Sequence, residues 1–375
     1  MSKLPHIGTT IFTVMSQMAN QYNAINLSQG FPNFPVDERL TAIVAKRAIE
    51  PIHQYMPMAG YLPLLEKIGM LTQKSYQRNV SPLSEILVTA GATEGIFATI
   101  QALIHDGEEV IILDPSYDCY EAPILLCNAK PIRIALRDDF TPDWDKIGNA
   151  INSKTRMIIT NNPHNPTGKI WTENDFVALE KLLDIYPDII VLSDEVYEYI
   201  TFENAHISVN QRAKLRDRSV IISSFGKSFH ITGWKIGYVI AAERYLIEIK
   251  KVHQFLVFSV NSIAQYAIND YLEVVAVDAL GAFYRQKRDF FKTLMSDTKF
   301  DLLPCEGSYF QVASYATITD ENDIDFSTKL VKAYGVAAIP LSVFYADQTD
   351  RRLIRFCFAK DDATLVNAAK QLKLL

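Results

Sequence analysis

The chain has 375 residues, of which 49% are hydrophobic and 21% charged, so it can bury a large core, and its length suggests two domains. Its formal net charge of -6 excludes a broad basic surface for nucleic acid or anionic membrane, so a local pocket must bind any anionic ligand. No apolar run is long enough to cross a bilayer and the first residues lack the apolar core of a signal peptide, which predicts a cytoplasmic protein.

The first half of the chain predicts an α/β domain. From about residue 85, short β-branched runs alternate with longer amphipathic segments, a pattern typical of a mostly parallel sheet flanked by helices. The predicted strands are 86–90, 109–113, 131–136, 156–160, 188–192 and 219–223. The clearest helical patterns between them are 93–104 and 173–185.

The second half predicts a smaller α+β domain. A long helical region over 243–274 is followed by a helix over 284–295 and by a mixture of strands and helices. The predicted strands are 309–313, 336–339 and 353–358, and the helices are 324–334 and 363–372. No Gly/Ser-rich or Pro-rich linker occurs, so we expect the long helix to join the two domains rigidly. We place the large domain at 41–270 and the small domain at 1–40 and 271–375.

The cysteines and histidines predict neither a disulfide framework nor a metal site. The seven histidines show no HxxxH or similar pair. The four cysteines show no CxxC spacing, and most stand among apolar or aromatic neighbours, as reduced core residues do. They are Cys119, Cys127, Cys305 and Cys357.

Polar or glycine-containing motifs follow four of the predicted strands, at 91–93, 161–168, 194–197 and 224–227. In open α/β sheets, ligands bind beyond the carboxyl ends of the strands, so these motifs are expected to converge in space. Gly91-Ala92-Thr93 opens a helix and can present N–H groups to a phosphate, or can serve only as a tight turn. Neither GxGxxG nor GxxxxGK is present, which favours a single small phosphate over a nucleotide.

Asn165, Asp194 and Tyr197 are the candidate ligand contacts on the middle strands. Asn165 stands in an irregular loop between two prolines, where an ordinary Asn-Pro turn is the alternative. Asp194 ends a run apolar enough to be buried on both faces, and a protonated ring nitrogen would supply the cation that it lacks. A helix cap or a distant salt bridge is the alternative for Asp194, and a core position is the alternative for Tyr197.

Lys227 follows the last apolar strand, among small hydroxyl residues and eight positions before Lys235. Partial burial and a second cation lower the pKa of a lysine, which suits Schiff-base chemistry with an aldehyde; a solvated lysine is the alternative.

Arg355 stands in the apolar strand Leu353–Phe358, where a buried guanidinium needs an anion. A substrate carboxylate would accept its two parallel N–H bonds, and a protein carboxylate is the alternative.

The order and spacing of these motifs resemble those of the fold type I, class I/II aminotransferases that use pyridoxal 5'-phosphate (PLP). The resemblance runs through INLSQGFPNFP, NNPHNPTG, SDEVYE, SSFGKSFHITGWKIGY and LIRFCFAKDDATL, and so covers nearly the whole chain. Within the family, KVHQFLVFSVN, FYRQKRD, CEGSYF and YGVAAIPLSVF are most similar to the kynurenine and glutamine transaminase branch, and especially to bacterial methionine aminotransferases.

The resemblance implies a role for each cofactor contact. Lys227 would form the Schiff base with PLP and move the proton between the substrate Cα and the cofactor, while Asp194 would keep the pyridine nitrogen protonated. Asn165 and Tyr197 would bind the ring 3'-oxygen. The phosphate would be held by Ala92, Thr93, Ser224 and Lys235, together with Tyr55 from the other subunit of a homodimer. Tyr117 would stack on the face of the ring. Lys235 stands where aspartate aminotransferases carry an arginine.

The resemblance also implies the substrate contacts. Arg355, with Asn165 and the Gly30 backbone, would bind the α-carboxylate. The side-chain walls would be Phe12, Phe31 and Phe258, the last reaching the site of the partner subunit. No second arginine for a dicarboxylic substrate is evident, so large apolar, sulfur-containing or aromatic amino acids are favoured.

We therefore expect a transaminase that moves the amino group of methionine, an aromatic amino acid or glutamine to a 2-oxo acid. Two alternatives remain open. A β-eliminating carbon–sulfur lyase could use the same carbanion on the same scaffold. A PLP-binding regulatory module would bind cofactor without turnover, but it would carry a basic winged-helix segment, which this chain lacks.

Overall fold

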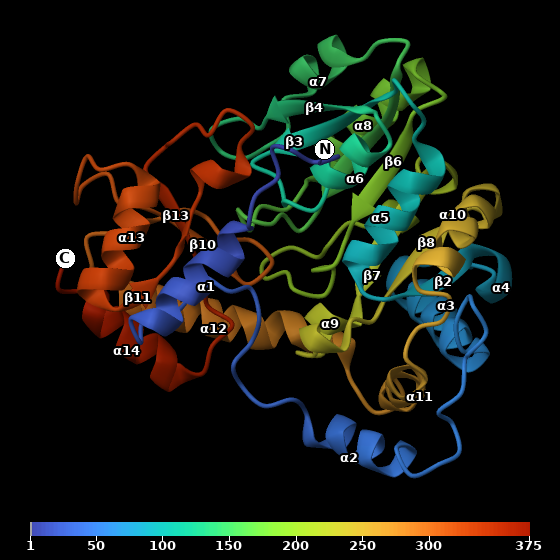
Figure 1. Cartoon of the computed structure of the whole chain (residues 1–375), viewed down its shortest axis with the longest axis horizontal. Helices are drawn as coiled ribbons and strands as arrows, with labels where there is room; N and C mark the ends of the chain where they lie inside the picture. The colour runs from blue at the N-terminus through green and yellow to red at the C-terminus, as the bar shows by residue number, and fades with distance from the viewer. Residues whose placement is uncertain (1) are drawn as a thin grey trace.

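A computed structural model describes residues 2–375, so Met1, which the predicted small domain includes, lies outside the described residues. The chain folds as α/β around a seven-stranded sheet, with a separate four-stranded sheet beside it (Figure 1). The strands are β1 Ile25–Asn26, β2 Ile86–Thr89, β3 Glu109–Asp114, β4 Lys130–Ala135, β5 Thr155–Asn161, β6 Ile190–Asp194, β7 Ser219–Ser224, β8 Gly237–Ala241, β9 Asp301–Leu302, β10 Phe310–Ser314, β11 Val336–Ala337, β12 Ile339–Pro340 and β13 Leu353–Cys357. The α-helices are α1 Ile11–Gln21, α2 Glu38–Arg47, α3 Leu62–Tyr76, α4 Pro82–Glu85, α5 Ala92–Leu103, α6 Glu121–Leu126, α7 Trp144–Ala150, α8 Glu173–Ile185, α9 Phe225–Ser228, α10 Glu243–Leu256, α11 Ser262–Tyr271, α12 Leu280–Met295, α13 Asp323–Tyr334 and α14 Asp362–Leu372.

The large sheet has the strand order β2-β8-β7-β6-β5-β3-β4 and is parallel from β7 to β4. Its middle strands are buried on both faces because successive side chains enter opposite cores. In β7, Ile221 packs against the core that includes α3, α8 and α11, whereas Val220 and Ile222 pack against α5 and α10. The helices therefore cover both faces, as the sequence predicts.

The smaller sheet has the order β12-β13-β10-β9 and is antiparallel, and the short β1 pairs with β11 beside it. Figure 1 shows α12, α13 and α14 gathered around this sheet, away from the large one. Helix α1 belongs to the same part, because its buried Met15 and Ala19 pack against Val312 and Ile339. This packing holds the N-terminal segment across the carboxyl ends of the large sheet.

The predicted elements mostly match the observed ones, and the six predicted strands of the large sheet all form within two residues of their expected bounds. The predicted helical region 243–274 is wrong as one helix, because α10 ends at Leu256 and α11 begins at Ser262. The break occurs where Phe258 adopts a left-handed backbone with φ of 65°, after which the Asn261 side chain caps α11. The expected rigid connecting helix is therefore two shorter helices.

Two further differences concern strands. The predicted strand 336–339 is two strands in different sheets, β11 and β12, because the chain crosses from one sheet to the other within it. The sequence prediction also lacks β8, an antiparallel strand that lies between β2 and β7. In the part of the chain from residue 2 onward, no helix is both long and apolar enough to cross a membrane.

Candidate active site

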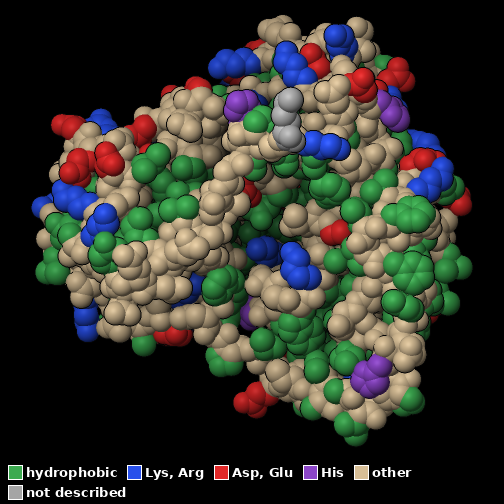
Figure 2. Space-filling view, viewed as in Figure 1, with side chains coloured by type: hydrophobic (Ala, Val, Ile, Leu, Met, Phe, Trp, Pro, Cys, Tyr) green, Lys and Arg blue, Asp and Glu red, His purple; other side chains and the backbone are tan. Residues whose placement is uncertain are grey.

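A cavity of about 310 Å³ lies between the carboxyl ends of the large sheet and the N-terminal segment. Figure 2 shows the molecule hollowed at the centre of this face, with Lys or Arg side chains inside the hollow. The predicted site residues that line the cavity are Phe12, Gly30, Phe31, Ala92, Thr93, Tyr117, Asn165, Asp194, Tyr197, Ser224, Lys227, Lys235 and Arg355. Tyr55 and Phe258 do not line it within one chain; they pack edge to face on each other, and Tyr55 is 83% exposed.

Lys227 lies in the single turn α9, directly after β7. Its Nζ is 3.5 Å from the Gly30 carbonyl oxygen and about equally far, 5.8 and 5.9 Å, from the ring centres of Tyr197 and Tyr309. Burial lowers the pKa of Lys227 to about 8, and the charges of Arg355 and Lys235 also lower it. Lys227 therefore carries an appreciable fraction of unprotonated, nucleophilic amine near neutral pH.

Asp194 ends β6 with its carboxylate buried. Oδ2 accepts a hydrogen bond of 2.7 Å from the Tyr120 hydroxyl, and Oδ1 accepts a longer one of 3.3 Å from the Val196 backbone N–H. Among residues 2–375, no Lys, Arg or His forms an ion pair with it, so the expected alternative of a distant salt bridge is not observed. Burial raises the pKa of Asp194 to about 6.

This raised pKa predicts that Asp194 destabilises the ligand-free protein. A carboxyl with a higher pKa in the folded state than in the unfolded chain binds its proton more tightly when folded, so stability falls as the pH rises from about 4 to about 6. The rise in the pKa of Asp194 from its ordinary value of 3.8 to about 6 corresponds to about 3 kcal/mol. We expect Asp194→Asn to raise the free energy of unfolding of the ligand-free protein by up to that amount at pH ~7, measured by denaturant titration. The gain should vanish near pH ~4, and a less stable variant at neutral pH would contradict the argument.

Arg355 lies in β13 and has no solvent exposure. Nη1 donates to Asn165 Oδ1 at 2.7 Å and Nη2 donates to the Ser28 carbonyl at 2.9 Å, while Nε has no partner among the described residues. The guanidinium lies 3.9 Å from the centre of the Phe310 ring. No carboxylate in residues 2–375 forms an ion pair with Arg355. The charge of Arg355 lowers the pKa of Asp118 against the larger, opposite effect of burial, so the guanidinium has a carboxyl in its neighbourhood but no direct anionic partner.

The loop after β5 carries Asn165 and is tied to Asp194 through Asn161. The Asn161 side chain accepts a 2.7 Å hydrogen bond from the Asn165 backbone and donates one of 3.0 Å to the Asp194 carbonyl. Asn161 also lines the cavity, and the sequence prediction does not include it. Its position at the end of a predicted strand, inside the same motif as Asn165, is the signal that could have identified it.

The start of α5 forms the second polar end of the cavity. Gly91 precedes the helix with φ of 79°, and the first-turn N–H groups of a helix have no acceptor within the helix. A Cβ on Gly91 would lie 3.4 Å from the Lys235 Nζ, so the Lys235 ammonium group lies beside the first residues of α5. Ser224, the last residue of β7, completes a set of donors suited to a small anion.

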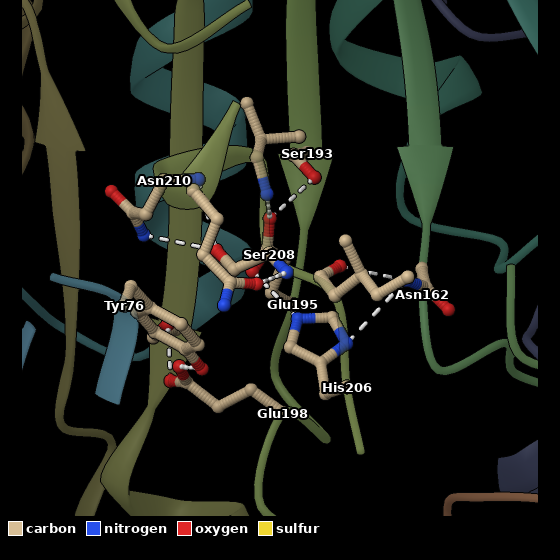
Figure 3. Close-up of polar contacts among 12 residues, drawn as sticks. Tyr76, Asn162, Ser193, Glu195, Glu198, His206, Ser208 and Asn210 are labelled. Atoms are coloured by element: carbon tan, nitrogen blue, oxygen red, sulfur yellow. Dashed lines mark hydrogen bonds and ion pairs between the residues drawn. The ribbon is translucent and has the colours of Figure 1, made fainter. Parts of the chain in front are cut away.

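A buried polar network is built around Glu195 and Glu198, which follow cavity residues in the chain (Figure 3). Glu195 accepts hydrogen bonds from His206 Nε2 at 2.8 Å and from Ser193 at 2.9 Å, and Glu198 accepts from Tyr76 and from Ser223. Each carboxylate of the network directly follows a cavity residue in the chain, Glu195 after Asp194 and Glu198 after Tyr197. Because the neighbouring backbone is fixed in this way, the cavity residues are held in place by side chains that never enter it.

Comparisons with known proteins show what the whole chain is similar to. A family model described as aminotransferase class I and II matches residues 22–372. The methionine aminotransferase of Escherichia coli (strain K12) is 45% identical over 378 residues, covering 100% of this chain and 98% of that protein. The kynurenine–oxoglutarate transaminase of Dictyostelium discoideum is 30% identical, covering 96% of this chain and 93% of that protein. A crystal structure from Escherichia coli with a methionine aminotransferase function is similar at a TM-score of 0.97 and 45% identity, covering 100% and 99% of the two chains.

Proposed function

The chain belongs to the class I and II aminotransferases, a family that depends on PLP, and from this premise we propose that it transfers the amino group of methionine or another large apolar or aromatic amino acid to a 2-oxo acid. The observation that supports this most strongly is Arg355, a fully buried guanidinium whose Nε has no partner among the described residues and which forms no ion pair with any described carboxylate. A substrate α-carboxylate would supply the missing negative charge.

The donor set of the cavity fits PLP. The anion site at the start of α5 suits the phosphate of PLP. The buried carboxylate of Asp194 suits its protonated ring nitrogen, and the Lys227 amine, with its lowered pKa, suits its aldehyde. We propose that Ala92, Thr93, Ser224 and Lys235 hold the phosphate, that Tyr117 packs on the ring, and that Asn165 and Tyr197 bind its 3'-oxygen. When bound, PLP supplies an electron sink for the bond broken at the substrate Cα.

The protein's own residues then have separate tasks. Lys227 Nζ would take the proton from the substrate Cα and deliver it to the cofactor carbon C4', so that one amine serves as base and as acid. Asp194, as a carboxylate, would hold the positive charge on the ring nitrogen. Arg355 and the Gly30 backbone would fix the α-carboxylate, so that the Cα–H bond points at the amine.

The walls of the cavity support a preference for large uncharged side chains. Phe12, Phe31 and Tyr117 line it, and among its lining residues the only cations are Lys227, Lys235 and Arg355. Each of these three already has a proposed partner, so none remains for a side-chain carboxylate. Gln29 also lines the cavity, and its amide donates to the Phe12 carbonyl at 3.1 Å, which holds α1 over the site.

A panel of amino donors tests this preference. With one 2-oxo acid as acceptor, we expect kcat/KM for methionine or phenylalanine to exceed that for aspartate by about 100-fold or more, because the aspartate side chain would be buried without a partner. Kynurenine and glutamine complete the panel. An enzyme that prefers aspartate or glutamate would contradict the proposed specificity.

We further propose a homodimer in which Tyr55 and Phe258 reach the site of the partner subunit. Their exposure, 83% and 48%, supports this proposal, as does their mutual edge-to-face packing outside the cavity of their own chain.

The division into a large domain at 41–270 and a small domain at 1–40 and 271–375 also remains a proposal, supported by the confinement of the seven-stranded sheet to residues 86–241. The cytoplasmic location stays a prediction from the sequence.

A further inference from the structure

Tyr120 lies just before α6, and its hydroxyl group makes the shortest hydrogen bond to the Asp194 side chain. The tyrosine is 2% exposed, and its hydroxyl donates to Asp194 Oδ2 over 2.7 Å. Its ring meets the Tyr117 ring edge to face, with centroids 6.0 Å apart. Tyr120 does not line the cavity, so it can act on a ligand only through these two neighbours.

The surroundings of Asp194 make this donor important. The titratable groups that face the carboxylate are Tyr120, Tyr117, Cys119, Tyr197, Glu195 and Lys227. Only Lys227 among them is a cation, and the charge of Glu195 opposes ionisation of Asp194. Val196 contributes a backbone N–H, but at the longer distance of 3.3 Å. The Tyr120 hydroxyl is therefore the main hydrogen bond that favours the carboxylate over the neutral acid.

The bond also orients Asp194. Because Oδ2 is bound to Tyr120, the rotation of the carboxylate is fixed and Oδ1 is left with one long backbone contact. Asp194 lines the cavity, so its Oδ1, which can accept a further hydrogen bond, is available to a cationic ring nitrogen bound there. A fixed charge of this kind needs no reorganisation when the ligand binds.

We propose that Tyr120 is a positioning residue that keeps Asp194 ionised and aimed at the ring nitrogen of the cofactor. This inference rests on the proposed binding of PLP at Asp194. Tyr120 touches neither substrate nor cofactor under this proposal, and its effect is transmitted by one hydrogen bond. Nothing in the sequence distinguishes it from the other 17 of the chain's 18 tyrosines.

The variant Tyr120→Phe tests the proposal, because it keeps the ring packing and removes only the donor. The readout is the dissociation constant of PLP from the enzyme as a function of pH, followed by the absorbance of the bound cofactor, with no substrate present. Without the donor, Asp194 takes up its proton at higher pH and can no longer hold the protonated ring. Cofactor affinity falls on the acid side of neutrality as Asp194 takes up its proton, and we call this part of the pH profile the acid limb. We expect Tyr120→Phe to move the acid limb up by about one pH unit, so that the affinity falls about tenfold at pH ~5 and only about twofold at pH ~7.

Tyr76→Phe is the matched control, since Tyr76 is also a buried tyrosine that donates to a carboxylate, that of Glu198. It should reduce the stability of the protein and leave the acid limb in place. Incorporation of 3-fluorotyrosine at position 120 supplies a variant of nearly the same size with a more acidic hydroxyl. This stronger donor should move the acid limb to lower pH, opposite to Tyr120→Phe.

The outcomes separate the inference from the proposed function. An acid limb that moves up with phenylalanine and down with 3-fluorotyrosine supports the role of Tyr120. An unmoved acid limb, or an affinity loss that is equal at every pH, would overturn it and leave Tyr120 a packing residue. Failure of the unaltered protein to bind PLP at any pH would instead overturn the proposed function.

Discussion

Lys227→Ala is expected to reduce amino transfer by a factor on the order of 10⁴ and to remove the covalent attachment of the cofactor. The amine of Lys227 lines the cavity with its pKa lowered to about 8, because burial disfavours its charged form. Alanine leaves neither a nucleophile for the aldehyde nor a base for the Cα proton. Borohydride reduction followed by mass measurement of the protein detects the linkage, and single-turnover kinetics measure the transfer.

Lys235→Ala is the matched control for this experiment, because Lys235 lies in the same cavity beside Gly91. We expect it to weaken cofactor binding and to keep the reducible linkage, since its proposed partner is the phosphate. If borohydride still fixed the cofactor to Lys227→Ala, another lysine would carry the linkage and the assignment would be wrong.

Arg355→Ala is expected to lower kcat/KM for methionine by about 100- to 1000-fold. The substrate carboxylate would then lie in the cavity without a cation, because no other described guanidinium lines it. The reducible cofactor linkage should be retained, since Lys227, which would form it, makes no hydrogen bond to Arg355. Steady-state kinetics and the reducible linkage, measured on the same preparation, separate the two effects.

Arg355→Lys completes the series. It keeps a positive charge but loses the planar fork that binds a carboxylate through two parallel hydrogen bonds, so its kcat/KM should lie between those of the other two proteins. An unchanged KM and kcat in Arg355→Ala would show that the buried guanidinium is structural.

Much of the cavity could be predicted from the sequence because parallel strands end at one edge of a sheet. Asp194, Ser224 and Asn165 each follow an apolar run that reads as a buried strand, so their convergence follows from topology alone. Arg355 could be predicted because a cation in an apolar strand requires an anion. The role of each residue was then predicted from the resemblance of the motifs and their spacing to those of the aminotransferase family.

The rest depends on contacts between residues far apart in the chain. Tyr120 and Asp194 are 74 positions apart, and His206 and Asn162 are 44 apart, so no local pattern indicates either pair. The break after α10 depends on the left-handed backbone of Phe258, a conformation that an apolar residue seldom adopts. Periodicity alone therefore predicted one continuous helix where two occur.

Transfer of labelled nitrogen is the most direct test of the proposed function. The enzyme, loaded with PLP, is incubated with [¹⁵N]methionine and an unlabelled 2-oxo acid, and the products are measured by mass spectrometry. The proposal predicts that the ¹⁵N label appears in the amino acid formed from the oxo acid, in equal amount to the oxo acid formed from methionine. Release of the label as ammonia, with no labelled amino acid formed, would contradict it.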